Sequence, residues 1–172
     1  MSAASTYRLE DLPAHVGGVL GISEWVTIDQ AKIDAFAAAT GDLQWIHVDA
    51  ERAIAGPFGT TIAHGFLTLS LLPLLSSTAF AIVDVGTAVN YGLNRVRFPA
   101  PLPVGSRVRG RFELLACHAL SSAMQLTIKA TVEREGSDRP VCVAEALSRR
   151  FASTSINGPQ RGRNTSNTKE TQ

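Results

Sequence analysis

Two residues in the segment TGDLQWIH, residues 40–47, have side chains that could work together in catalysis: Asp42 and His47. Histidine titrates near pH ~6.5 and aspartate near ~3.9, so at neutral pH the pair offers an imidazole base and a carboxylate. Such a pair can bind a water molecule, take a proton from it and return a proton elsewhere, which is general acid–base catalysis. The structural alternative is that Asp42 caps a helix end and His47 packs in a turn, because an Asp-x4-His spacing often arises by chance.

A second candidate lies in the segment GTTIAHG, residues 59–65, which opens a long apolar run. Free N–H groups at a helix N-terminus, with the helix dipole behind them, can stabilise negative charge that develops on an oxygen. Gly65 has no Cβ, so a substrate could approach its backbone closely. The alternatives are that Gly65 serves only packing and that His64, which could join the site, is a packing histidine at the helix start.

The elements that would position Asp42 follow from the residues before it. Residues 27–30, TIDQ, match a capping box, in which the hydroxyl and the Gln three positions later satisfy free N–H groups. The alanine-rich run through Ala39 has helical spacing, and Gly41 is well placed as the C-terminal stop of that helix. We therefore expect Asp42 just beyond a helix end.

Two further helices are expected between residues 50 and 79. Asp49 could cap a short helix over residues 50–55, which Gly56 and Pro57 would end. The run from residue 62 to residue 79 is apolar on nearly all sides, as expected of a helix buried within a domain. Pro73 inside it predicts a kink or a break.

The rest of the chain is rich in β-forming residues and turn residues, which predicts consecutive strands. The expected strands are 18–26, 88–98, 106–116, 122–133 and 141–151. Because no helices separate the last four, the pattern argues against a parallel α/β fold. The prediction is a single α+β domain in which an antiparallel sheet curls around a long central helix.

Length and composition limit the class of protein. A chain of 172 residues with 45% hydrophobic and 18% charged residues can bury a core as one domain. A net charge of +1 argues against nucleic-acid binding. The N-terminus lacks a signal-peptide pattern, the apolar runs fall short of the ~20 residues of a membrane span, and Cys117 and Cys142 fit no metal or redox spacing. We expect a cytoplasmic protein that binds neither nucleic acid nor membrane.

The expected organisation has three parts. Residues 1–17 form an N-terminal segment, residues 18–152 form the domain, and residues 153–172 form a polar tail. Because the tail has almost nothing apolar to bury, it is predicted to be disordered.

The site segments together resemble the MaoC-like dehydratases, the (R)-specific enoyl-CoA hydratases. The family pattern is an aromatic, a small residue, Gly-Asp, a spacer, Asn-Pro, an aliphatic, His, and a small residue after five more positions. Downstream, GPFGTTIAHGFLTLSLL resembles the central helix of the family, and YGLNRVRFPAPLPVGS resembles the strand and turn that follow. The resemblance covers residues 22–151, and its residues here are Phe36, Thr40, Gly41, Asp42, Leu43, Ile46, His47 and Ala53.

The resemblance implies a hot-dog fold and an activity. Asp42 and His47 would activate a water molecule that adds to C3 of a trans-2-enoyl thioester, while the Gly65 N–H would bind the thioester oxygen. The product would be an (R)-3-hydroxyacyl thioester, and the reaction would be reversible, with no cofactor and no metal. A homodimer is expected, as in other hot-dog proteins. Gln44 and Trp45 stand where the family has Asn-Pro, which puts the loop geometry in doubt.

Other residues are candidates for binding the acyl thioester, carried by coenzyme A or acyl carrier protein. Trp45 and Ile46 give the pair an apolar setting, Asn90 and Tyr91 could line an acyl pocket, and Arg97 could meet phosphates. The arginines could equally lie on a solvated sheet face; the set is Arg95, Arg97, Arg107, Arg109 and Arg111. A metal site formed by Asp42, His47, Asp49 and His64 is the weaker alternative, since the ligand spacing is not recognisable.

Two rival functions remain open from the sequence. A hot-dog thioesterase would hydrolyse the same kind of thioester, and a non-catalytic acyl-binding or partner subunit would do no chemistry. The Gly-Asp…His pattern favours hydration over thioester hydrolysis, and the presence of both Asp42 and His47 argues against a non-catalytic subunit.

Overall fold

Four long antiparallel strands form the body of the fold in the computed structural model, which describes residues 5–153. A short strand, β2 (Val19–Ile22), completes the sheet in the order β2-β6-β7-β8-β5, and β3 (Val26–Thr27) also pairs with β6. The long strands are β5 (Val85–Arg97), β6 (Arg107–Ala119), β7 (Met124–Arg134) and β8 (Cys142–Ala152). All pairings in this sheet are antiparallel, which confirms the predicted consecutive strands.

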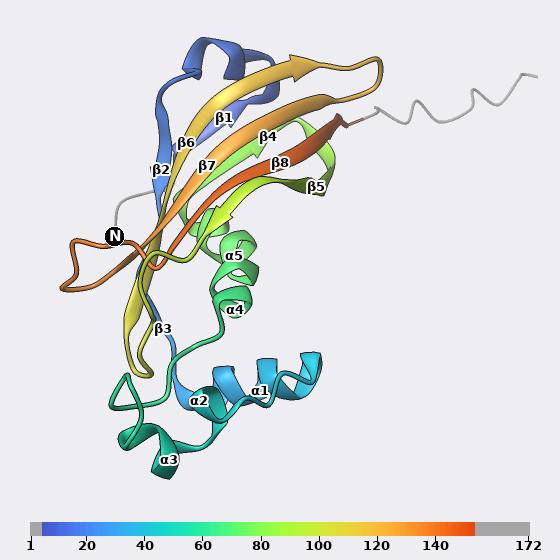
Figure 1. The fold of residues 1–172 in the computed structure, drawn as a ribbon. Coiled ribbons are helices and arrows are strands. Elements are labelled where there is room, and N and C mark those ends of the chain that lie inside the picture. The colour runs from blue at the N-terminus through green and yellow to red at the C-terminus, as the bar shows by residue number, and fades with distance from the viewer. Residues whose placement is uncertain (1–4, 154–172) are drawn as a thin grey trace, which may run out of the picture.

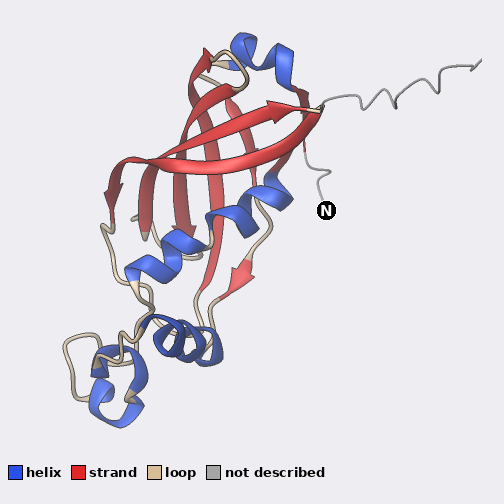
Figure 2. Cartoon of the chain, turned by 90° about the vertical axis from the view of Figure 1, so that its right-hand side faces the viewer, coloured by secondary structure: helices blue, strands red, loops and turns tan. Residues whose placement is uncertain are grey.

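The central helix lies against the concave face of this curled sheet (Figure 1, Figure 2). It consists of α4 (Gly65–Ser70) and α5 (Leu72–Ala79), separated at Leu71. Pro73 stands in the first turn of α5, where its missing N–H costs no helical hydrogen bond. The predicted break is therefore confirmed, and the α+β class with a sheet around a central helix is confirmed as well.

Apolar side chains from the inner sheet face and the central helix share one core. Leu75 of α5 is fully buried, as are Leu114 of β6 and Leu126 of β7. Alternate residues of β6 and β7 face inward, as the period of a strand requires. This packing fixes the central helix, and with it the position of Gly65.

Three helices gather at one end of the sheet (Figure 1): α1 (Gln30–Thr40), α2 (Trp45–Val48) and α3 (Ala50–Ile54). Gly41 ends α1 in the left-handed conformation with φ 75°, and the Asp49 carboxylate caps α3 by accepting from the Arg52 N–H, both as predicted. The capping-box prediction was wrong. Asp29 caps α1 by accepting from the Lys32 N–H, because Thr27 is already engaged in strand β3.

The N-terminal segment is built into the domain at the opposite end of the sheet (Figure 1). Strand β1 (Ser5–Arg8) pairs in parallel with β4 (Phe80–Val83), and the 3₁₀ helix η1 (Leu9–His15) follows. Leu12 is fully buried, so the fold extends back to Ser5 and includes most of residues 1–17. The prediction for the tail falls outside the described residues after Ser153. Within residues 5–153, the helices are all too short or too polar to cross a membrane.

Candidate active site

His47 occupies a buried position in α2 that leaves one ring nitrogen free to act as a base. Its side chain is 6% exposed, and its Nδ1 lies 2.7 Å from the carbonyl oxygen of Ile62. Because a carbonyl oxygen only accepts hydrogen bonds, Nδ1 carries the proton of the neutral ring and Nε2 has a free lone pair. This is the tautomer that a general base needs.

Gln30 connects the three segments that hold His47 in place. Its side-chain N–H group donates to the His47 carbonyl oxygen at 2.8 Å, and its side-chain oxygen accepts from the Thr61 hydroxyl at 2.6 Å. The backbone adds a further link, since the Ile62 N–H donates to the Ile46 carbonyl at 3.0 Å. The side chain that the capping-box reading assigned to a helix end therefore ties α1 to α2 and to the segment before α4.

Asp42 follows the left-handed Gly41 and lies at the surface, with His47 and His64 close to it. One carboxylate oxygen of Asp42 and one nitrogen of each ring lie within 4.8 Å of one another. The end of α1 and the short helix α2 thus bring the side chains of Asp42 and His47 close together. A water molecule between the carboxylate and His47 Nε2 could donate to both.

His64 belongs to the same cluster, although its residue type and place in the sequence favoured a packing role. It is 2% exposed and stacks on His47 with ring centroids 3.7 Å apart. Its Nε2 lies 2.9 Å from the carbonyl oxygen of Asp42, and its Nδ1 has no hydrogen-bond partner among residues 5–153. His64 therefore holds the backbone of Asp42 against the start of the central helix.

Gly65 is the first residue of α4, so its N–H has no acceptor within the helix and can donate to a ligand. A Cβ at this position would lie 2.9 Å from the ring of Phe98. Packing therefore also requires a glycine here. Gly65 can therefore serve both packing and hydrogen bonding to a substrate, because Phe98 contacts its Cα side and leaves its N–H available.

Trp45, in α2, packs against α3 and the glycine that follows it. The Arg52 guanidinium lies 4.4 Å from its ring centroid, and a Cβ on Gly56 would touch its ring at 2.9 Å. Trp45 is the first residue of α2, the helix position at which a proline is tolerated. This explains how the turn is kept although Gln44-Trp45 replaces the Asn-Pro of the family pattern.

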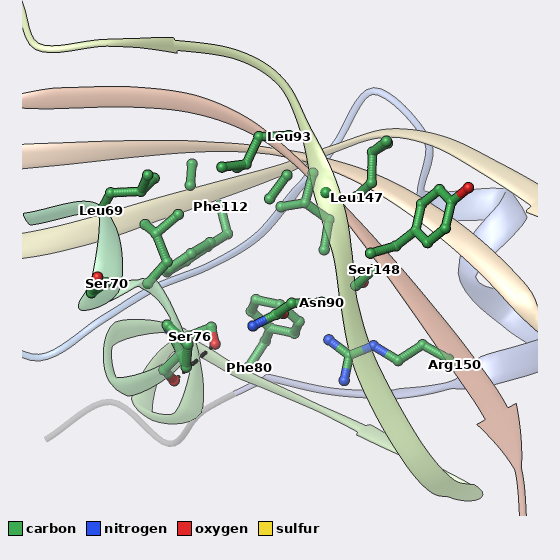
Figure 3. Close-up of a pocket in the computed structure, with 17 residues that line it drawn as sticks. Leu69, Ser70, Ser76, Phe80, Asn90, Leu93, Phe112, Leu147, Ser148 and Arg150 are labelled. Carbon is green, nitrogen blue, oxygen red and sulfur yellow. Dashed lines mark hydrogen bonds between the residues drawn. The ribbon is translucent and has the colours of Figure 1, made fainter. Parts of the chain in front are cut away.

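A cavity of about 460 Å³ opens between the central helix and the sheet (Figure 3). Its lining begins at Leu69, one turn beyond Gly65, and it includes the predicted pocket residues Asn90 and Tyr91 of β5. The volume is in the range of small-molecule sites. The cavity therefore runs along the central helix from one turn beyond Gly65, and neither Gly65 nor the cluster of Asp42, His47 and His64 lines it.

The predicted arginines lie elsewhere. Arg97 is exposed on β5, where its guanidinium donates to the Val96 carbonyl at 2.7 Å, and it does not line the cavity. Three others form ion pairs on the outer sheet face at 2.7 to 3.0 Å: Arg107 with Glu135, Arg109 with Glu133 and Arg111 with Glu113. For Arg107, Arg109 and Arg111, the alternative that they lie on a solvated sheet face is therefore the better description.

The residues that could hold a metal are Asp42, His47 and His64, whose ligand atoms lie within 4.8 Å of one another. Asp49, the fourth member of the set drawn from the sequence, instead caps α3. Each histidine already uses one nitrogen on a backbone carbonyl. Such a hydrogen bond is compatible both with a metal ligand and with a free base.

The fold and the site together define a class: a curled antiparallel sheet around a central helix, with an aspartate–histidine pair at the start of that helix. A sequence model of the family described as MaoC like domain matches residues 11–137. The chain belongs to this family, whose solved structures include (R)-hydratases with the hot-dog fold.

Particular relatives narrow the comparison. 3-Hydroxyacyl-thioester dehydratase Z of Mycobacterium tuberculosis is 57% identical over 143 residues, which cover 83% of this chain and 95% of the relative. Nodulation protein N of Rhizobium leguminosarum bv. viciae is 50% identical over 139 residues, 79% of this chain and 86% of the relative. (R)-hydratase PhaJ1 from Pseudomonas aeruginosa has a TM-score of 0.66 at 23% identity, covering 80% of this chain and 83% of that one. The (R)-hydratase from A. caviae has a TM-score of 0.64 at 23% identity, covering 77% and 94%.

Proposed function

We propose that this protein is an (R)-specific enoyl-thioester hydratase that runs reversibly as a 3-hydroxyacyl-thioester dehydratase. The observation that carries the proposal is the meeting of the Asp42 carboxylate with a His47 whose Nε2 is free, beside the start of α4. Its 57% identity to a dehydratase of this name supports the same reaction. The substrate is a trans-2-enoyl group on coenzyme A or acyl carrier protein, and fatty-acid metabolism is the corresponding context.

The proposed reaction gives a role to Asp42, His47 and the Gly65 N–H. Water bound between Asp42 and His47 gives up a proton to the pair as its oxygen bonds to C3 of the enoyl group. The electrons of the C2–C3 double bond move toward the thioester carbonyl, whose oxygen accepts a hydrogen bond from the Gly65 N–H. The proton is then delivered to C2, and the carbonyl re-forms. No redox partner is consumed, and the water proton that the pair removes balances the proton delivered to C2.

The test is to incubate the protein with crotonyl-CoA and to follow the enoyl absorbance and free thiol together. Loss of the absorbance without thiol release supports the proposal. Thiol release favours a thioesterase, and binding without either change favours a non-catalytic acyl-binding subunit. Burial raises the pKa of the Cys142 thiol to about 11 and also raises that of Cys117, so the folded protein contributes little background to the thiol reading.

We also propose that the chain works as a homodimer, paired along β5. This strand lies at one edge of the sheet, and nearly all of its 13 residues are exposed. Exposed apolar side chains lie along the strand, among them Val89, Tyr91 and Leu93. A long unpaired edge of this kind is a template for a second strand.

The dimer prediction is tested by sedimentation at micromolar protein concentration. We expect a species of twice the 18.3 kDa chain mass, because pairing would cover the β5 edge and its apolar side chains. A single 18.3 kDa species under these conditions would contradict it.

Metal removal should leave the proposed activity unchanged. In the proposed reaction, Asp42 and His47 supply the acid–base chemistry and Gly65 the oxyanion donor, so dialysis against EDTA is expected to preserve the rate of crotonyl-CoA hydration. Loss of the activity on dialysis, with recovery on adding Zn²⁺, would instead assign the cluster of Asp42, His47 and His64 to a metal. The cytoplasmic location stays a prediction.

A further inference from the structure

One end of the cavity beside the central helix carries polar groups from strand β8. Ser148 and Arg150 are two residues apart, so they project from the same face of the strand. In the sheet register Ser148 stands opposite Leu126 and Arg150 opposite Met124, and Leu126 is fully buried in the core. Strand β8 therefore places an arginine on the concave face, where the neighbouring strand places apolar side chains.

These groups have no partners among the described residues. Ser148 is 7% exposed, and neither its Oγ nor the Arg150 Nε makes a hydrogen bond, although both atoms are buried. No carboxylate of residues 5–153 lies within 4.0 Å of the Arg150 guanidinium, and no acidic residue lines the cavity. Burial lowers the pKa of Arg150, as expected for a cation withdrawn from water.

Unsatisfied buried donors are costly, and a partly buried cation such as Arg150 is stabilised further by a counter-ion. Native proteins keep such groups where water, an ion or a ligand satisfies them or where they serve a functional role. A ligand that completes this one must accept hydrogen bonds and carry negative charge. A carboxylate meets both requirements, because its two oxygens match the planar guanidinium fork and can also accept from a hydroxyl.

The side chains that line the cavity differ between its two ends. Figure 3 shows Leu69 and Phe112 at one end and Ser148 and Arg150 at the other, with Asn90 beside them. Leu69 lies one turn along α4 from Gly65. An acyl chain whose thioester oxygen binds at the Gly65 N–H would enter at the apolar end and direct its far end toward Arg150.

We propose, resting on the hydratase function above, that the cavity selects an enoyl thioester whose chain ends in a carboxylate, bound by the Arg150 guanidinium and the Ser148 hydroxyl. The substrate class is thus an ω-carboxyacyl thioester rather than a simple fatty acyl one. A methyl-ended chain of the same length would leave the guanidinium without a counter-ion.

The test compares matched pairs of trans-2-enoyl-CoA substrates over a series of chain lengths, one member of each pair ending in a methyl group and the other in a carboxylate. At the length that reaches Arg150, kcat/KM is expected to favour the carboxylate at least ~10-fold, as for other close charge pairs. Arg150→Met should abolish this preference by slowing only the carboxylate substrate. Arg111→Met, which removes an arginine from the outer face, should preserve it.

Several results would overturn the inference. Equal kcat/KM for both members at every length would do so, and so would an Arg150→Met variant that slows both members equally, since Arg150 would then serve the fold or an interface. If that variant does not fold, inhibition of the wild-type enzyme decides: saturated ω-carboxyacyl-CoA must compete better than its methyl-ended counterpart. Crotonyl-CoA separates the two proposals, since its short chain needs no contact with Arg150. Without crotonyl-CoA turnover the hydratase function fails; with turnover but no carboxylate preference, only the present inference fails.

Discussion

Replacing Asp42 with asparagine, or His47 with glutamine, is expected to slow hydration of crotonyl-CoA at least ~10²-fold while the protein stays folded and still binds enoyl-CoA. Asparagine keeps the shape of the side chain but removes its charge, and glutamine keeps polarity but cannot transfer a proton near neutral pH. Loss of a positioned acid or base typically costs ~10²–10⁴-fold in rate. Because the two groups share one water in the proposed reaction, the double variant should be barely slower than either single one.

Two substitutions of the same types serve as controls. Asp49→Asn changes a nearby carboxylate that only caps α3, and asparagine is an equally good cap. His118→Gln changes an exposed histidine of β6. Both should keep turnover close to that of the wild type. If Asp42→Asn or His47→Gln also kept near-normal turnover, the acid–base pair would be wrong, and Asp42 would be better explained as a residue of the helix end.

Gly21→Ala is expected to be the most destabilising conservative change in the sheet. Gly21 lies in β2, where the end of α5 crosses it, and an added Cβ would stand 2.1 Å from the carbonyl oxygen of Ala79. Overpacking costs typically 1–3 kcal/mol, and here the obstacle is backbone that has no alternative rotamer. We expect a loss of about 3 kcal/mol or more in the free energy of unfolding, which lowers Tm by roughly 6–12 °C.

The matched control is Gly92→Ala in β5, because no atom of the same chain lies within 4 Å of a Cβ at that position and its φ is not in the left-handed region. Thermal unfolding followed by circular dichroism measures both variants. A Gly21→Ala protein as stable as Gly92→Ala would mean that the contact between β2 and α5 is looser than described, and with it the anchoring of the central helix.

Local chemistry made much of the fold predictable from the sequence. Gly41 requires no partner to adopt the left-handed conformation, so its position predicted the end of α1 and the place of Asp42 just beyond it. Pro73 predicted the helix break in the same way, and the turn residues between β5, β6, β7 and β8 predicted four strands to within a few residues. These signals act over a few neighbouring residues, which is why the sequence reveals them.

Contacts between distant residues account for what the sequence did not reveal. The local pattern of residues 27–30 fits a capping box, but Thr27 pairs with β6 and Gln30 reaches Thr61 and the His47 backbone. Both partners are distant in sequence, so no local pattern contains them. The parallel pairing of β1 with β4 is of the same kind, and it brings residues of the N-terminal segment into the domain.

In the site, too, local signals were predictable and contacts between distant residues were not. The motif located Asp42 and His47, but the stacking of His64 on His47 depends on where the central helix begins relative to α2. Arg150 was missed for a different reason. Alternation along β8 places Arg150 on the inner face with Ser148, yet an arginine in a strand normally indicates the solvent face. Only its partly buried position, with an unpaired buried Nε, distinguishes it.

The central claim is that Asp42 and His47 add the oxygen of water to C3 of an enoyl thioester. The most direct test is turnover of crotonyl-CoA in water enriched in ¹⁸O, with the product analysed by mass spectrometry and chiral chromatography. The account predicts one ¹⁸O atom in the C3 hydroxyl of an intact (R)-3-hydroxyacyl thioester, with no label in a released carboxylate. Label in a free carboxylate, or an (S)-alcohol as the product, would contradict it.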